Sequence, residues 1–347
     1  METTYFLKVV GIEESINIKT MSKLIDINIQ DETAPLEAVI LGTARDLGSP
    51  YFHYVDPAKW DSKIAPEEDQ ITDPKSRLHL MNGTYPLEAD LRRENDSFAR
   101  ILAKYNVRVY QPITLPSTNQ VFTRDIGFVI DNIFIKSNMG TVERQSEFFA
   151  IRGIVSRIAQ EVWFPPQTVK VEGGDVFPFR DKIFIGQADK NSHGLRCDRT
   201  NQAAVEYLAS KFPNKEVIPI LLKKSDIDPK ENCLHLDCCF QPIGNNDHCI
   251  IHLDGFHNKD QAYQLMDLFG GEKNAIKINK DQMYNMNSNI FSINPKVVIS
   301  GNNSEEFGSL NKQIRDFGIT VEEIPYSETS KMEGLLRCST LPLRRSY

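Results

Sequence analysis

The segment from Leu234 to Cys239 reads Leu-His-Leu-Asp-Cys-Cys and places an imidazole and a carboxylate two residues apart. On an extended strand the side chains of His235 and Asp237 would leave the same face, where they could act together in acid–base chemistry. A core strand with one hydrogen-bonded histidine and one exposed aspartate would show the same pattern, so this segment alone does not identify a site. The rest of the chain has to distinguish the two interpretations.

Side chains capable of acid–base or nucleophilic chemistry return at similar intervals along the chain. The recurring positions are Asp125, Asp175, Asp237, Asn289 and Cys338, separated by 50, 62, 52 and 49 residues. Glu172 stands three residues before one of them, and His235 two residues before the next. Such a coincidence in spacing favours a site over isolated surface residues, provided that the fold brings the equivalent positions together.

Hydrophobic periodicity predicts the elements that would position these side chains. The first predicted elements are a strand at 36–41, an irregular stretch at 43–86 that could form a lid, a helix at 87–105 and a strand at 107–111. Four copies of a hairpin, a helix and a strand follow. The hairpins are predicted at 126–136, 176–185, 239–252 and 289–300, the helices around 148–162, 199–212, 265–269 and 307–317, and closing strands at 169–171, 217–221 and up to 324.

Four copies, with the two ends of the chain completing a fifth, predict a closed ring. We expect one α/β-propeller domain over 25–347, with five-fold pseudosymmetry and ββαβ repeats, after a loosely held extension 1–24. An open mixed sheet is the competing architecture, but the β-β-α-β order differs from the alternation of a doubly wound fold. In a ring, equivalent positions face the axis together, so the recurring polar residues would meet at one end of the channel.

Composition narrows the class of protein. The chain has 347 residues, 40% hydrophobic residues and a formal net charge of −7. No uninterrupted apolar run is long enough to span a membrane, and the acidic balance argues against a general nucleic-acid binder and favours a small cationic partner. The N-terminal residues contain no apolar core of a secretion signal, so we expect a cytoplasmic protein. The number of subunits is left open, a homo-oligomer included.

Cysteines are concentrated in one stretch of the chain. Four of the six, Cys233, Cys238, Cys239 and Cys249, lie within seventeen residues. In a large chain without a secretion signal, this pattern indicates reduced thiols rather than a disulfide framework. These cysteines with His235 could also suggest a zinc site, but the spacing lacks a CxxC pair, so we expect neither a metal nor another cofactor.

The recurring residue types are suited to a particular substrate chemistry. Carboxylates that share a dry pocket repel each other unless a cation lies between them. A guanidinium meets this requirement, because its planar N–H donors can bond a carboxylate in bidentate fashion. A nearby cysteine thiolate could then attack the central carbon.

From about residue 119 to its end, the chain resembles the guanidino-group modifying superfamily. This superfamily has the pentein fold and includes arginine deiminases, amidinotransferases and dimethylarginine dimethylaminohydrolases. Several independent motifs occur in the expected order. They are Asn119, the run Phe122-Thr123-Arg124-Asp125, Arg144, the run Glu172-Gly173-Gly174-Asp175, Arg199-Thr200, His235-Leu236-Asp237, and Arg337-Cys338 with Pro342-Leu343.

The resemblance implies a role for each matched residue. Cys338 would be the nucleophile and His235 the acid and then the base, with Glu172 holding His235. Asp125 and Asp237 would clamp the guanidinium. The further substrate-binding positions that it implies are Asn119, Phe122, Arg144, Asp175 and Arg199, of which Asn119, Arg144 and Arg199 would hold the amino-acid end of an arginine-like substrate.

The reaction type is less sharply indicated than the superfamily. The runs 172–175 and 337–343 resemble those of deiminases, whereas Thr340 with Arg344-Arg345 is similar to the ending of amidinotransferases. We expect a hydrolase acting on arginine or a close derivative, with a citrulline-type product and ammonia. An amidinotransferase that moves the amidino group to an amine such as glycine is the alternative. A dimethylarginine dimethylaminohydrolase and a non-catalytic binding protein of the same fold rank behind these two.

Overall fold

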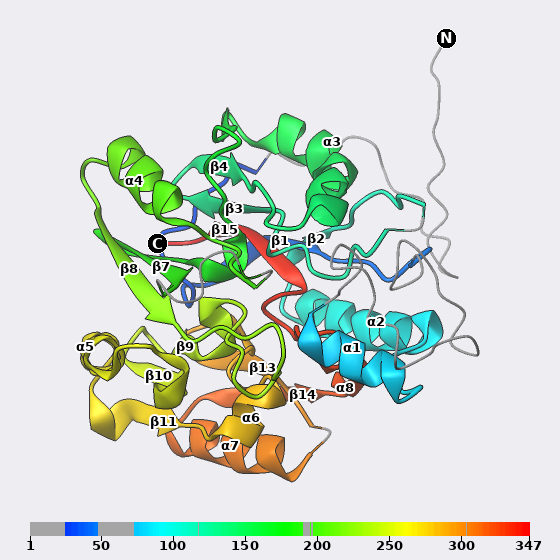
Figure 1. Ribbon diagram of the computed structural model, residues 1–347, viewed down its shortest axis with the longest axis vertical. Helices are drawn as coiled ribbons and strands as arrows, with labels where there is room; N and C mark the ends of the chain where they lie inside the picture. Colours follow the sequence, from blue (N-terminus) through cyan, green and yellow to red (C-terminus); the bar gives the residue numbers. More distant parts are fainter. Residues whose placement is uncertain (1–24, 48–72, 117, 190–194, 196, 303) are drawn as a thin grey trace.

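Five small β-sheets arranged around a common axis form the core of the molecule (Figure 1). The computed structural model describes residues 25–47, 73–116, 118–189, 195, 197–302 and 304–347. Each sheet has three strands, and its central strand is antiparallel to one neighbour and parallel to the other. This arrangement confirms the predicted five-fold propeller of ββαβ repeats.

The strands follow the repeat in chain order. The sheets comprise β3 (Gly127–Ile130), β4 (Ile133–Lys136) and β5 (Glu161–Trp163); β6 (Val176–Phe179), β7 (Lys182–Ala188) and β8 (Glu216–Leu222); β9 (Phe240–Ile243), β10 (His248–Ile251) and β11 (Ala275–Lys277); β12 (Phe291–Asn294), β13 (Val297–Gly301) and β14 (Thr320–Ile324); and β15 (Thr340–Arg345), β1 (Leu36–Leu41) and β2 (Arg108–Tyr110). A tight hairpin joins each antiparallel pair within the first four sheets. A parallel pair needs a longer crossover, and the main helices fill these crossovers.

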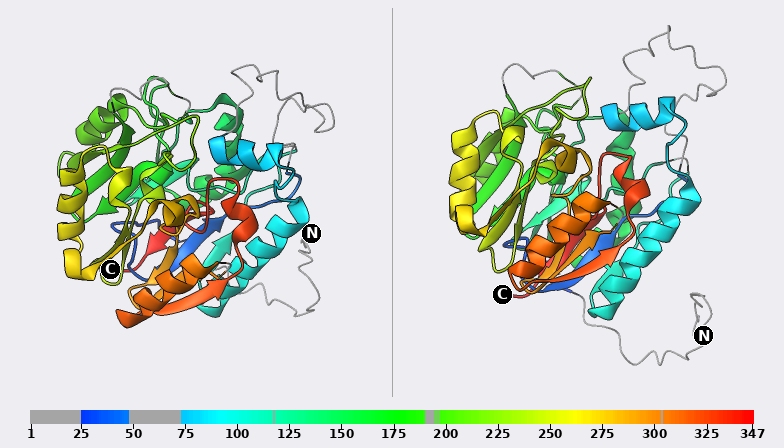
Figure 2. Two further views of the ribbon diagram at one scale, coloured as in Figure 1. Left: turned by 60° about the horizontal axis from the view of Figure 1, so that its bottom comes forward. Right: turned by 90° about the horizontal axis from the view of Figure 1, so that it is seen from below.

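The long helices that connect parallel strands lie on the outside of the ring (Figures 1 and 2). They are α2 (Glu88–Lys104), α3 (Phe149–Ile158), α4 (Gln202–Lys211), α5 (Lys259–Leu268) and α7 (Glu305–Asp316); the other α-helices are α1 (Pro74–Met81), α6 (Lys280–Tyr284) and α8 (Ser327–Ser330), and short 3₁₀ helices are η3 (Val142–Phe148), η4 (Gly173–Asp175), η6 (Leu236–Cys238), η7 (Leu253–Gly255) and η8 (Glu272–Asn274). In α7, for example, Phe307, Leu310 and Ile314 are buried at helical spacing while the intervening charged residues face outward.

The two ends of the described chain close the ring in one sheet. Strand β1 pairs antiparallel with β15, with Leu41 opposite Thr340, and parallel with β2. The amide of Gly42 also donates to the Ser339 carbonyl at 2.8 Å. Because Cys338 lies two residues before β15, the pairing of β1 with β15 also fixes the backbone position of Cys338.

In the first of the four repeats, the closing strand was predicted at the wrong residues. The sequence indicated a helix that includes Val162 and a strand at 169–171, but α3 ends at Ile158 and Val162 lies in β5. Ala159 takes an extended conformation, which starts the strand early enough to pair in parallel with β4. Val171 is buried and makes only an isolated bridge to Asn138. Burial of apolar residues without strand pairing therefore misled the prediction.

The stretch 43–86 is less irregular than expected, because α1 lies within it. Asp73 caps this helix by accepting a hydrogen bond from the Ser76 amide, and Pro74 occupies its first turn. The extension 1–24 lies outside the described residues, as does 48–72, so the division at residue 24 and the single domain remain predictions. Among the helices that the structure describes, none combines the length and apolar character needed to cross a membrane.

Candidate active site

His235 begins a 3₁₀ turn rather than lying on a strand. Its backbone is extended, with φ −133° and ψ 169°, and the η6 turn follows immediately. The prediction that His235 and Asp237 share one strand face is therefore wrong. The turn sends the imidazole toward Glu172 and Asp125, whereas the Asp237 carboxylate faces Cys338.

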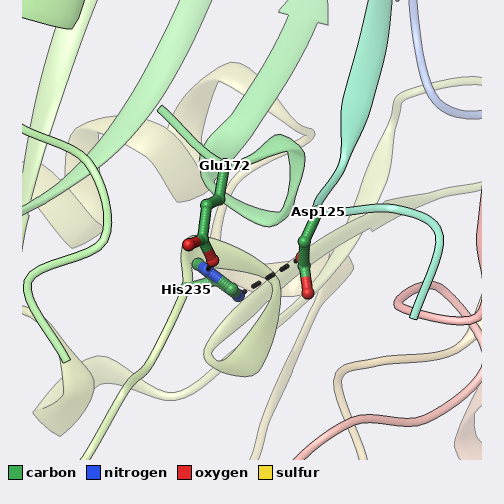
Figure 3. A group of neighbouring side chains, drawn as sticks. All are labelled: Asp125, Glu172 and His235. Atoms are coloured by element: carbon green, nitrogen blue, oxygen red, sulfur yellow. Dashed lines mark hydrogen bonds and ion pairs between the residues drawn. The ribbon is translucent and has the colours of Figure 1, made fainter. Parts of the chain in front are cut away.

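Glu172 is the hydrogen-bond partner of His235 (Figure 3). Its Oε2 atom lies 2.9 Å from His235 Nε2, and its Oε1 accepts a 2.8 Å hydrogen bond from the Gly140 amide. Arg199 Nη1 lies 3.3 Å from the same carboxylate. Burial alone would raise the pKa of Glu172, but Arg199 and His235 outweigh it and lower the pKa to about 2. Glu172 is therefore a fixed negative charge behind the imidazole.

The two glycines after Glu172 are required by close packing. A Cβ atom on Gly173 would lie 2.1 Å from the Arg124 carbonyl oxygen, and one on Gly174 would lie 2.6 Å from His235 Nδ1 and 3.0 Å from Asp125 Oδ1. Such distances are too short for real side chains, so the backbone can approach the imidazole this closely only with glycine at position 174. The Gly-Gly pair thus allows three segments of the chain to meet.

The second ring nitrogen of His235 faces Asp125. Nδ1 lies 3.7 Å from Asp125 Oδ1, which is buried and has no hydrogen-bond partner among the residues that the structure describes. Burial lowers the pKa of His235, but Asp125, Asp175 and Glu172 outweigh it and raise the pKa above its usual value. The imidazole is therefore biased toward its protonated form. A buried acceptor without a donor, such as Oδ1 here, is typical of a position that a ligand completes.

The other oxygen of Asp125 is held by Arg144. Nη1 of Arg144 donates to Asp125 Oδ2 at 2.7 Å, and the same guanidinium bonds Glu147 in bidentate fashion at 2.9 and 3.0 Å. Burial raises the pKa of Glu147 to about 7, against the lowering effect of Arg144. These contacts fix the direction in which the free oxygen of Asp125 points.

Cys338 lies beside Asp237 and Asn289. Its sulfur is 3.5 Å from Asp237 Oδ2 and 3.2 Å from Asn289 Nδ2, and only 2% of the residue is exposed. Burial, Asp237 and Asp125 together raise the pKa of this thiol well above its usual value. In the absence of a cation, Cys338 is therefore a neutral thiol.

Arg337 forms a buried ion-pair network with Asp237 and Glu32. The sequence did not predict this network. Arg337 Nη1 donates to Asp237 Oδ2 at 2.8 Å, while its Nε and Nη2 bond Glu32 at 3.2 and 3.0 Å. Its guanidinium also stacks on Phe177, 3.8 Å from the ring centre. In the sequence Arg337 stands out only as part of the motif around Cys338, and Glu32 carries no local signal because its partners are far away in the chain.

The other predicted substrate contacts have different surroundings. Asp175 accepts a 2.9 Å hydrogen bond from the Leu236 amide and so supports the turn between His235 and Asp237. Phe122 belongs to the small apolar cluster that also includes Cys338. Asn119 is half-buried and accepts a hydrogen bond from the Val121 amide at 3.1 Å. Of the five residues, Arg144 and Arg199 pair directly with candidate catalytic carboxylates.

Three of the site residues could in principle ligate a metal ion. Asp125, Glu172 and His235 each offer a ligand atom, and these atoms lie within 4.8 Å of one another. Two of these groups already carry short ion pairs to Arg144 and Arg199. A divalent cation would add positive charge where two guanidiniums are already present, so the donor set suits an ion-paired acid–base site better than a metal site.

The structure thus brings five predicted residues into two adjoining groups. Glu172, His235 and Asp125 form one, and Cys338 with Asp237 forms the other. Asp125 connects them, because its charge raises the pKa of both His235 and Cys338. No hydrogen bond joins Cys338 to His235 in the described part of the chain. A planar cation between the groups would meet a carboxylate on either side, a sulfur nucleophile and an imidazolium.

Comparison with known families gives a match over most of the chain. Residues 86–344 match the family described as N,N dimethylarginine dimethylhydrolase, eukaryotic. The uncharacterized protein YkgA of Bacillus subtilis (strain 168) is 29% identical over 268 residues, which cover 74% of this chain and 82% of YkgA. Arginine deiminase of Borrelia recurrentis (strain A1) is 25% identical over 270 residues, or 68% of this chain, and the chain spans 63% of that deiminase.

Solved structures share the fold. SxtG, an amidinotransferase from Microseira wollei in the saxitoxin biosynthetic pathway, superposes with a TM-score of 0.67 at 15% identity, covering 93% of this chain and 98% of SxtG. The N-terminal domain of ArgZ, a cyanobacterial arginine dihydrolase bound to product, gives a TM-score of 0.68 at 18% identity, covering 89% and 97% of the two chains. At these identities the likeness concerns the fold.

Proposed function

Since this chain belongs to the N,N-dimethylarginine dimethylhydrolase family, within the pentein superfamily of guanidino-modifying enzymes, we propose that it hydrolyses the guanidino group of arginine through a covalent intermediate on Cys338. The products are citrulline and ammonia. The observation that carries this proposal is the pair of buried carboxylates, Asp125 beside His235 at 3.7 Å and Asp237 beside the Cys338 sulfur at 3.5 Å. A cation that neutralises them would also release the thiolate.

The clamp favours an unsubstituted guanidinium over a dimethylated one. Arginine presents N–H donors on both terminal nitrogens, so each nitrogen can bond one carboxylate. In N,N-dimethylarginine one terminal nitrogen carries two methyl groups and no N–H, and it would leave a buried carboxylate without a donor. An unsatisfied buried acceptor costs about 1–3 kcal/mol, and more when it is charged. This cost would fall on Oδ1 of Asp125, which has no hydrogen-bond partner among the described residues.

Each step of the reaction has a residue in place. The bound guanidinium lowers the pKa of Cys338, so the thiol proton passes to solvent and the resulting thiolate attacks the central carbon to form a tetrahedral adduct. The adduct collapses when the carbon–nitrogen bond to one terminal nitrogen breaks, and protonated His235 gives that nitrogen its proton from Nδ1. Ammonia leaves, and a positively charged thiouronium remains on the sulfur.

Water completes the cycle. Neutral His235 removes a proton from a water molecule, and the resulting hydroxide attacks the thiouronium carbon. The carbon–sulfur bond then breaks and the hydroxyl proton of the adduct passes to solvent, which gives citrulline and the thiolate. Glu172 keeps its charge throughout and stabilises the imidazolium, since its carboxylate has a pKa of about 2. Asp125 and Asp237 keep the carbon in line with the sulfur, a positioning effect that can contribute several kcal/mol.

Asn119, Phe122, Arg144 and Arg199 are our candidates for contacts with the remainder of the substrate. Arg144 keeps 17% of its side chain exposed while it bonds Asp125, so a ligand on Asp125 would come within its reach. Phe122 belongs to the apolar cluster that includes Cys338, so it would offer an apolar surface to the substrate. The arginines would then be shared between the protein carboxylates and the carboxylate of the amino acid.

Product analysis tests the proposal and separates it from its alternatives. The protein should convert arginine to citrulline and ammonia without an acceptor, and Cys338→Ser should abolish this conversion. Dimethylamine released from N,N-dimethylarginine at a higher kcat/KM than ammonia from arginine would assign the family's named substrate instead. Ornithine formed only when glycine or another amine is present would assign an amidinotransferase. A protein that binds arginine with no product in any of these assays would be a non-catalytic binding protein.

A further inference from the structure

The loop that carries Cys338 is held by one residue of the fourth repeat, Asn289. Its main-chain oxygen accepts hydrogen bonds from the amides of Leu336 and Arg337 at 3.1 and 3.2 Å. Its side-chain oxygen accepts from the amides of Leu335 and Cys338 at 3.2 and 3.0 Å. Four successive backbone N–H groups therefore converge on a single asparagine, which is fully buried.

The remaining polar atom of this asparagine faces the sulfur. Asn289 Nδ2 lies 3.2 Å from Cys338 Sγ, and it also lies 3.4 Å from the Asp237 main-chain oxygen. Because the side-chain oxygen is already occupied by two amide donors, the orientation of the side chain is fixed and the amino group must point toward the sulfur. An N–H donor at this position stabilises a sulfur anion more than a neutral thiol.

The charges around the Cys338 sulfur explain why an uncharged N–H donor at position 289 would stabilise the thiolate better than an acidic side chain. Cys338 interacts electrostatically with five charged or titratable groups: Asp237, Asp125, Arg337, Cys238 and Tyr326. Two carboxylates oppose the thiolate, and Arg337 favours it. The equivalent positions of the preceding repeats, Asp125 and Asp237 among them, are acidic. An acidic residue in place of Asn289 would add a third negative charge beside the nucleophile and oppose its ionisation further.

We propose that Asn289 is a further functional residue, which fixes the loop of Cys338 and donates a hydrogen bond that stabilises the attacking thiolate. The proposal deepens the proposed function, because it depends on Cys338 being the nucleophile. Its test must therefore report on the sulfur itself and not on turnover alone.

The measurement is the pH dependence of Cys338 alkylation by iodoacetamide in the resting protein, with the modified peptide quantified by mass spectrometry. Hydrogen bonds to a charged group contribute about 1.5–3 kcal/mol, so Asn289→Ala should raise the apparent pKa of Cys338 by about one to two units. At neutral pH its alkylation should slow roughly 10- to 100-fold. Asn289→Asp, which keeps the acceptor oxygen but replaces the donor, should shift the pKa upward by at least as much.

Ser288→Ala is the matched control. Ser288 is the neighbouring residue, is equally buried and donates to the Asp237 main-chain oxygen at 3.0 Å, whereas the hydrogen bond to the sulfur in the described part of this segment comes from Asn289. Its alkylation profile should match that of the unmodified protein. A purely structural role predicts the opposite order, with Asn289→Asp closer to the unmodified protein than Asn289→Ala.

The outcomes separate this proposal from the proposed function. If Asn289→Asp shows the same alkylation pKa as Ser288→Ala, the hydrogen bond does not stabilise the thiolate and the proposal is overturned, whatever the turnover. If Asn289→Ala does not fold, the comparison of Asn289→Asp with Ser288→Ala decides alone. If the pKa shifts as expected while no guanidino compound is turned over, the role of Asn289 stands and the proposed function fails.

Discussion

Replacing Asp237 by asparagine should change the reactivity of Cys338 and the turnover of arginine in opposite directions. Asp237 Oδ2 lies 3.5 Å from the Cys338 sulfur and opposes its ionisation. Asparagine has the same shape and can still accept the hydrogen bond from Arg337, which Glu32 continues to hold. The substitution therefore removes a charge with little change in packing.

The magnitude follows from this separation. At an effective dielectric constant of about 20, two unit charges about 3.5 Å apart interact by roughly 5 kcal/mol, equivalent to three to four pKa units. Arg337, at 2.8 Å from the same carboxylate, already cancels part of this effect. We expect Asp237→Asn to lower the pKa of resting Cys338 by about one to two units and to accelerate alkylation at neutral pH. Loss of one side of the clamp should reduce kcat/KM for arginine roughly 10²- to 10³-fold.

Two assays on one preparation check these expectations. Iodoacetamide alkylation of Cys338 is followed from about pH 6 to about pH 10, across the ordinary thiol range, and citrulline formation is measured in parallel. Asp175→Asn is the matched control, because Asp175 is a buried carboxylate that bonds the Leu236 amide and should leave the alkylation profile unchanged. Slower alkylation in Asp237→Asn, or arginine turnover within tenfold of the unmodified protein, would refute the electrostatic reasoning.

Three further predictions concern the supporting residues. Glu172→Gln should lower the pKa of His235, because it removes the buried negative charge at 2.9 Å, and NMR titration of the imidazole will measure this shift. Glu32 has a pKa lowered from 4.5 to about 2, against the effect of burial, so its contribution to stability is present above about pH 4.5 and is lost as the pH falls toward 2. Between pH 5 and pH 3 this loss amounts to about 2 kcal/mol, so Glu32→Gln should weaken the pH dependence of the free energy of unfolding by about that much. Urea titrations at both pH values will measure it, and an equal pH dependence in the two proteins would contradict the assignment. Gly174→Ala should displace the imidazole and reduce kcat/KM by roughly 10²-fold or more, whereas Gly153→Ala, where a Cβ meets nothing within 4 Å, should leave both activity and folding intact.

Much of the fold could be predicted from local patterns. Turn residues between short apolar runs predicted the four hairpins, and helical spacing of buried residues predicted the helix after each. The failures arose where two local signals competed. Val162 continued the helical spacing of α3 but lies in β5, and the cap at Asp73 went unnoticed inside a stretch that looked irregular.

The candidate site was predicted by residue type and phase, but its internal contacts were not. The expectation that His235 and Asp237 share a face failed because a 3₁₀ turn begins between them. Asn289 was recognised as one of the recurring positions, yet its four amide partners and its contact with the sulfur depend on a loop 46 to 49 residues further along the chain. Nothing in either segment alone indicates that they touch.

Local sequence patterns are enough to predict the order of the elements, the repeat and the residue types available to the site, because these depend on interactions between residues a few positions apart. Which charges meet depends instead on contacts between segments that are distant in the chain. Glu32 and Arg337 are 305 residues apart and bond each other only because the two ends of the chain close the last sheet of the ring. That closure places Cys338 beside Asp237, and long-range Coulomb interactions in the buried centre then set the protonation of each group.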